Sequence, residues 1–89
     1  MIVEFDSSFL KSLSKIKDQS IIQRIKKTII ELENSSDLKK VRNLRKLSGY
    51  KTYFRIRIGD FRLGFESIDD DTIRLIIIAH RKDIYRNFP

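Results

Sequence analysis

The sequence has 89 residues, of which 40% are hydrophobic and 35% charged, and it carries a formal net charge of +7. This length fits a single domain over residues 1–89, the composition excludes collagen-like and most disordered chains, and the basic surplus points to a polyanionic partner. Because the chain has no cysteine, one histidine and no apolar run of membrane-spanning length, we expect a soluble cytoplasmic domain that uses no metal or cofactor and binds no membrane.

The first half of the chain predicts one strand and two helices. Met1–Phe5 is short and contains β-branched and aromatic residues, which favour a strand. Asp6 and Asp18 are suitable N-caps for the two segments that follow, and both segments carry apolar residues at helical spacing. The second predicts an amphipathic helix over about Gln19 to Glu33. Two helices with so short a joint predict a helical hairpin.

The second half predicts three strands. Two runs of alternating apolar and polar residues, 53–58 and 61–66, flank Gly59-Asp60, which suits the two-residue type II′ turn of a hairpin. Asp69-Asp70-Asp71 predicts a further turn rather than a cation site, because no other ligands converge on it. The apolar run from Ile73 to Ala79 predicts a strand buried on both faces.

The fold predicted from these elements is α+β. The N-terminal strand and a three-strand antiparallel meander form one four-stranded sheet, which is antiparallel and carries the helical hairpin on one face. The segment from Arg81 to Asn87 predicts a short C-terminal helical turn.

Positive charge is concentrated between Lys39 and Arg62, a segment with nine basic residues and one acidic residue. Strand alternation places Arg55 and Arg57 on one face, with Arg62 on the same face of the next strand. Guanidinium groups bind phosphate in a bidentate manner and keep their charge, so these residues predict a phosphate-binding surface. The alternative is a solvated sheet face with ion pairs to Asp60 and Glu66.

The segment after the last predicted strand adds further candidates. His80 is the only side chain whose unperturbed pKa lies near neutrality, and Arg81 follows it directly. Tyr85 offers a phenolic proton and an aromatic face for stacking an RNA base. The alternatives are a structural histidine and a core tyrosine. Glu66 is more favourably placed for an ion pair than for a general base.

Two motifs together resemble the RelE/ParE superfamily of bacterial toxins, and the RelE-type branch in particular. They are Tyr53–Phe65 and His80–Arg86, and the resemblance extends over nearly the whole chain. It implies the RelE-like fold and the toxin of a type II toxin–antitoxin system. RelE-type members are metal-independent endoribonucleases that cut mRNA in the ribosomal A site, where the 2′-hydroxyl attacks the neighbouring phosphate and translation is inhibited.

The resemblance also implies roles for individual residues. Arg55 and Arg57 stand where RelE enzymes have two active-site lysines, and since arginine cannot accept a proton, His80 becomes the expected base, with Tyr85 second. The catalytic set is therefore Arg55, Arg57, Arg62, His80, Arg81 and Tyr85. Four further basic residues are expected to bind RNA: Lys46, Lys51, Lys82 and Arg86.

The expected partners are the ribosome, mRNA and a RelB-like antitoxin whose acidic tail covers the arginines in a hetero-oligomer. Two alternatives remain open from the sequence. A ParE-type protein with the same fold would inhibit DNA gyrase instead of cutting RNA. A nonenzymatic relative would bind RNA without cleaving it.

Overall fold

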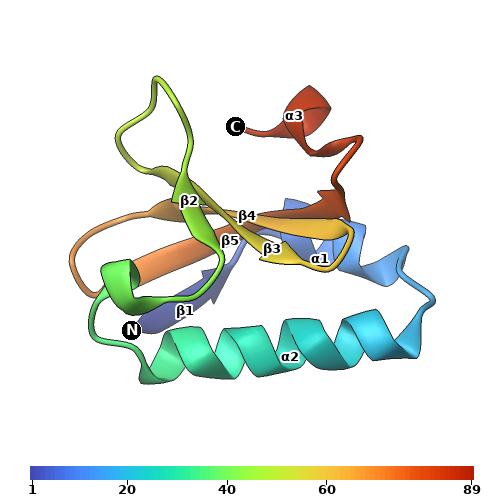
Figure 1. Ribbon diagram of the computed structural model, residues 1–89, viewed down its shortest axis with the longest axis horizontal. Helices are drawn as coiled ribbons and strands as arrows, with labels where there is room; N and C mark the ends of the chain where they lie inside the picture. The colour runs from blue at the N-terminus through green and yellow to red at the C-terminus, as the bar shows by residue number, and fades with distance from the viewer.

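The computed structural model describes all 89 residues, and its elements confirm the predicted α+β class (Figure 1). The helices are α1 (Ser7–Ser14), α2 (Gln19–Asn34) and α3 (Ile84–Asn87), with a 3-10 turn η1 (Leu38–Lys40). The strands are β1 (Ile2–Phe5), β2 (Leu44–Lys46), β3 (Tyr53–Ile58), β4 (Phe61–Ser67) and β5 (Thr72–His80). None of the helices combines the length and apolar character that crossing a membrane requires.

The sheet has five strands in the order β1-β5-β4-β3-β2, so the prediction of four antiparallel strands was wrong. The additional strand, β2, has three residues and forms by pairing antiparallel with β3, a contact that its own sequence pattern does not reveal. The sheet is mixed, because β1 pairs parallel with β5 at one edge. Helices α1 and α2 carry the chain from β1 at this edge to β2 at the opposite edge.

The predicted helix starts are confirmed. The Asp6 carboxylate accepts a hydrogen bond from the backbone N–H of Ser8, and the Asp18 carboxylate caps α2 in the same way. Helix α1 also covers the part of β5 that β1 does not reach. Ser8 Oγ donates to the Ile76 carbonyl at 2.6 Å, and Ser12 Oγ accepts from a β5 backbone N–H at 3.0 Å.

Two hydrophobic clusters lie on opposite faces of the sheet. The main core joins α1 and α2 to one face, and the smaller cluster holds Leu47, Ile84 and Phe88 against the other. In Figure 1, α2 lies below the sheet and α3 above it. Strand β5 contributes to both clusters, which confirms that it is buried on both faces.

A β-bulge in β5 changes which residues face the helices. Phe65 pairs with Leu75 and the preceding Gly64 pairs with Ile77, so Ile76 is an extra residue in the ladder. Beyond the bulge, Ile78 returns to the main core. Both predicted turns are confirmed, with Gly59 at φ +59° between β3 and β4 and the three aspartates between β4 and β5.

Candidate nucleic-acid interface

Four arginines point away from α1 and α2 on neighbouring strands. Arg55 and Arg57 alternate with core residues on β3, and Arg57 lies directly opposite Arg62 on β4. Arg45 on β2 lies directly opposite Arg55. Because the sequence pattern does not reveal β2, it also conceals this fourth arginine. We call Arg45, Arg55, Arg57 and Arg62 the arginine face.

Arg62 lies close enough to Arg55, Arg57 and Arg81 to be repelled by all three. Its Nη1 donates hydrogen bonds to the carbonyls of Gly59 at 2.9 Å and Phe61 at 3.0 Å, which fix the guanidinium against the β3–β4 turn. Burial, followed by repulsion from Arg55 and other nearby arginines, lowers the pKa of Arg62, although the Tyr85 oxygen opposes the shift. Arginine keeps its charge even so, and the site therefore favours an anion.

The protein itself supplies almost no negative charge to this surface. No member of the arginine face forms an ion pair. Asp60 contacts Arg81 at 4.0 Å between largely exposed side chains, an interaction that solvent screens. Glu66, the expected ion-pair partner, forms none. The alternative of a sheet face neutralised by cross-strand ion pairs is thus not what the structure shows.

Asn43 positions Arg57 and is a second residue that the sequence did not single out. Its carbonyl accepts the Arg57 backbone N–H at 3.1 Å, and its Oδ1 lies 3.4 Å from Arg57 Nη2. Asn43 adopts φ +62°, a left-handed conformation that asparagine tolerates better than most residues. Its only sequence signal is an asparagine within a basic segment.

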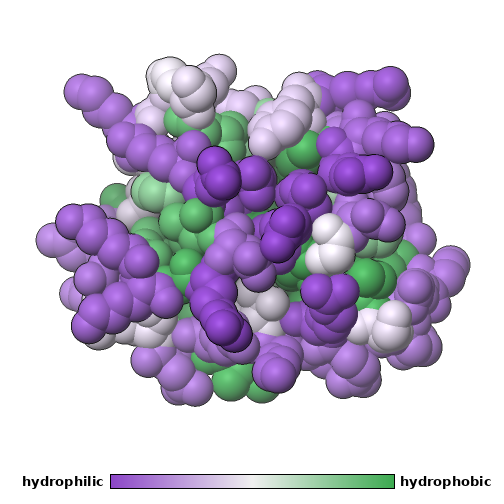
Figure 2. All heavy atoms as spheres, viewed as in Figure 1, coloured by the Kyte–Doolittle hydropathy of each residue, from purple (hydrophilic) through white to green (hydrophobic).

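The arginine face lines a groove. Its central concavity, of about 410 Å³, is lined by Asn43, Leu44 and the four arginines. On one side it continues into a concavity of about 330 Å³ that includes Arg81. On the other side a concavity of about 510 Å³ holds two tyrosines, Tyr50 and Tyr85. Figure 2 shows hydrophilic side chains extending through the middle of the view towards α2.

The C-terminal segment places Tyr85 at the groove. Its neighbour Ile84 is fully buried and Phe88 is 2% exposed in the smaller cluster, whereas Tyr85 is 63% exposed. Tyr85 is therefore not a core residue. Its side chain lines the groove together with Arg45 and Arg55. The structure thus places an aromatic ring beside the arginines, as the sequence predicts.

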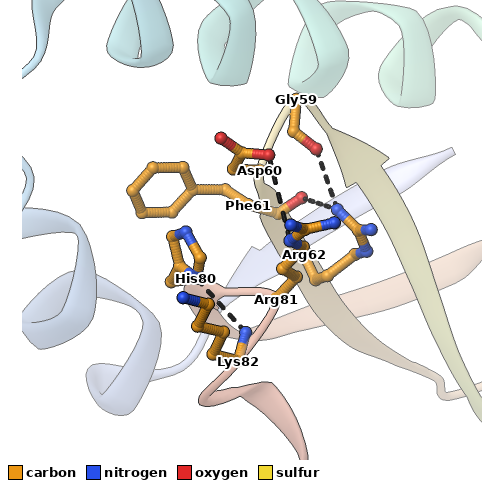
Figure 3. A network of polar contacts seen from close by, with 7 residues as sticks. All are labelled: Gly59, Asp60, Phe61, Arg62, His80, Arg81 and Lys82. Carbon is orange, nitrogen blue, oxygen red and sulfur yellow. Dashed lines mark hydrogen bonds and ion pairs between the residues drawn. The ribbon is translucent and has the colours of Figure 1, made fainter.

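His80 lies on the other face of the sheet. It pairs with Phe61 of the main core, and their ring centroids are 5.7 Å apart in an edge-to-face arrangement. Its Nδ1 accepts a hydrogen bond from the Lys82 backbone N–H at 3.2 Å. In Figure 3 the imidazole lies beside the Phe61 ring and apart from the guanidinium groups of Arg62 and Arg81. The structure therefore separates His80 from the arginines.

The other predicted RNA-binding residues are more dispersed. Lys46 lines the groove at the sheet edge, although its backbone pairs with Phe54 and not with an arginine. Lys51 and Lys82 are exposed and do not line the groove. Arg86 contacts Asp83 at 3.8 Å outside the groove. Of this set, only Lys46 lines the groove.

Comparison with known proteins places the chain in a family. A family model described as "ParE toxin of type II toxin-antitoxin system, parDE" matches residues 3–85. Toxin RelE3 of Methanocaldococcus jannaschii is 40% identical over 90 residues that span all of both chains.

Solved structures agree with this placement. The RelB-RelE antitoxin-toxin complex from Methanococcus jannaschii contains a chain with a TM-score of 0.80 and 38% identity, covering 97% of this chain and 99% of that one. The archaeal RelE-RelB complex from Pyrococcus horikoshii gives a TM-score of 0.71 at 20% identity, covering 90% and 93%, and shows the same fold. This chain therefore belongs to the RelE/ParE superfamily of toxins from type II toxin–antitoxin systems.

Proposed function

We propose that this toxin is a ribosome-dependent mRNA endonuclease that cuts in the A site and is neutralised by a RelB-like antitoxin. The arginine face carries the proposal, because four uncompensated guanidinium groups line one groove beside an exposed tyrosine. Phosphate is the anion that such a cluster of guanidinium groups suits best. The 40% identity to a relative named as a RelE toxin supports the same conclusion.

The proposed reaction needs no cofactor. The 2′-hydroxyl loses its proton and its oxygen forms a bond to the adjacent phosphorus. The bond from phosphorus to the 5′-oxygen breaks, and that oxygen takes up a proton, leaving a 2′,3′-cyclic phosphate and a 5′-hydroxyl end. The phosphorane on this path carries more negative charge than the diester, so preorganised cations lower its free energy. Arg62 and Arg81 supply the positive charge that stabilises the phosphorane, and Arg55 and Arg57 hold the phosphate.

Tyr85 is the group best placed to exchange protons in the groove. Its hydroxyl belongs to an exposed side chain on the same side of the sheet as Arg55, and phenols act as general acids and bases in enzymes. His80 would have to reach around the sheet edge, because its ring packs on the opposite face. We therefore place Tyr85 ahead of His80 as the proton-transfer residue, which reverses the order expected from sequence.

The positive charge of the groove also indicates what kind of antitoxin would bind this chain. A peptide with acidic side chains would neutralise the groove and occupy the place of RNA phosphates. Relatives of similar fold have been solved as complexes with RelB. We propose that a RelB-like partner binds this chain in a hetero-oligomer and covers the arginine face.

Expression in cells tests the proposed activity. The wild type should arrest growth and produce new mRNA ends within translated frames, and Arg62→Ala or Arg81→Ala should relieve both effects. Arg74→Ala is the matched control, because Arg74 is an arginine of β5 that pairs with Glu4 at 3.1 Å, away from the groove. Full toxicity of both groove variants would refute the assigned site.

Inhibition of DNA gyrase is the second candidate function, since the matching family model is described as a ParE toxin. Such a protein shares the fold but needs no RNA-cleaving groups. Inhibited supercoiling by the purified chain, with mRNA left intact in expressing cells, would select this function. Cleaved mRNA with normal supercoiling would exclude it.

A further inference from the structure

The groove does not end at the arginine face. A fourth concavity, of about 220 Å³, lies between α2 and the segment that precedes β2. Its basic lining residues are Arg24 and Lys27 of α2, Arg42, and Arg57 of the arginine face. Asn43 and Arg57 line this concavity, the central one and the one beside Arg81, so the three are continuous.

Arg24 connects the concavity beside α2 with the concavity that contains Arg62 and Arg81. It lies on α2, yet its Nη1 reaches to 2.8 Å from the position that a Cβ atom would take at Gly59, on the β3–β4 turn. It also lines the concavity that contains Arg62 and Arg81. The cationic surface therefore passes over the turn from the sheet to the helix, and Asp60 is the single acidic residue of the concavity at the turn.

Charge and chemistry indicate what this extension binds. Arg24, Lys27 and Arg42 form no ion pair, and Glu31 is the single acidic residue of their concavity. No aromatic residue lines it, whereas Tyr50 and Tyr85 line the other end of the groove. Bases stack on aromatic rings, and phosphates pair with cations irrespective of sequence. The two ends thus suit different parts of one strand.

We infer that Arg24, Lys27 and Arg42 form a second RNA-backbone site, which holds the phosphates flanking the bond to be cut. The inference rests on the proposed function, because it extends the same RNA strand along the same groove. Contacts in this site are independent of base identity. A short RNA that covers only the arginine face does not reach the site, and a longer one does.

Binding of 2′-O-methyl RNA, which lacks the attacking hydroxyl, tests the inference without cleavage. Fluorescence anisotropy at several salt concentrations gives the affinity and its salt slope for oligonucleotides of increasing length. The double variant Lys27→Gln/Arg42→Gln, whose residues line only the concavity beside α2, should lower the slope by about 0.7 per lost phosphate contact on the longest RNA, and leave the shortest unchanged. Lys26→Gln/Lys17→Gln is the control with the same charge loss, because neither lysine lines the groove.

The outcomes separate this inference from the proposed function. An equal slope for the test and control variants on every RNA overturns the second site alone. Failure of the wild type to bind any of these RNAs overturns the second site, whereas the proposed function, which depends on the ribosome, is overturned only if mRNA on ribosomes stays intact. Circular dichroism of both variants confirms that the exposed substitutions leave the fold intact.

Discussion

Gly64 has no side chain, and the Phe88 ring of the C-terminal segment packs directly against its backbone. A Cβ atom at this position would lie 2.9 Å from Cδ2 and Cε2 of Phe88 and 3.0 Å from its Cγ. These separations are well below van der Waals contact, and the ring is buried, so Gly64→Ala must displace it. Gly64 does not have a positive φ, so alanine is compatible with the strand backbone.

The cost of this substitution is set by overpacking. Inserting a methyl group into a packed cluster costs about 1–3 kcal/mol. This cost cannot exceed the free energy that attaches the C-terminal segment to the sheet, because detachment of the segment removes the clash. Phe88 and Ile84 belong to the smaller cluster, and the main core lies on the opposite face. We expect α3 to detach before the domain unfolds, and Tyr85 to leave the groove with it.

Amide hydrogen exchange over residues 81–89 and urea unfolding measure the effect. Gly64→Ala should reduce protection in that segment while protection of α2 is kept. In the Phe88→Ala background the clash is gone, so adding Gly64→Ala should cost nothing further, a strong departure from additivity. If Gly64→Ala costs the same free energy with and without the Phe88 ring, the reasoning is refuted.

Other predictions follow from the groove and the helix caps. Tyr85→Phe should abolish most mRNA cleavage and His80→Gln should retain it; the reverse result in a cleavage assay would restore the histidine as base. Arg45→Gln should weaken RNA binding measured by anisotropy, and unchanged affinity would remove this arginine from the site. Hydrogen bonds from Ser20 lower the pKa of Asp18, so its stabilisation is complete above the unfolded value of about 3.9 and is lost as the pH falls through the folded value. Asp18→Asn keeps a capping oxygen without the titration, so its thermal midpoint should fall less in acid than that of the wild type.

Local patterns predicted most elements correctly. Asp6 and Asp18 cap the helices because capping depends on residues two or three positions away. The hairpin turn at Gly59 likewise depends on adjacent residues. In contrast, β2 is three residues long and is a strand only through its pairing with β3. The parallel pairing of β1 with β5 joins opposite ends of the chain, which no local pattern encodes.

The sequence grouped His80 with the arginines because Arg81 follows it directly, and the bulge at Ile76 explains why the strand turns it to the other face. Strict alternation from Ile73 would place His80 on the arginine face. The extra residue reverses the phase, so that Ile78 and His80 face the side of α1 and α2 instead. Strict alternation places the arginines of β3 and β4 correctly, because the ladder between those two strands is regular.

Cleavage of mRNA on purified ribosomes tests the central claim most directly. Ribosomes stalled with an empty A site are incubated with the purified chain, and the mRNA ends are mapped and their chemistry determined. We predict cleavage within the A site that leaves a 2′,3′-cyclic phosphate, that is lost with Arg62→Ala and retained with Arg74→Ala. Intact mRNA with the wild-type chain, or equal cleavage by the Arg62→Ala variant, would contradict the account.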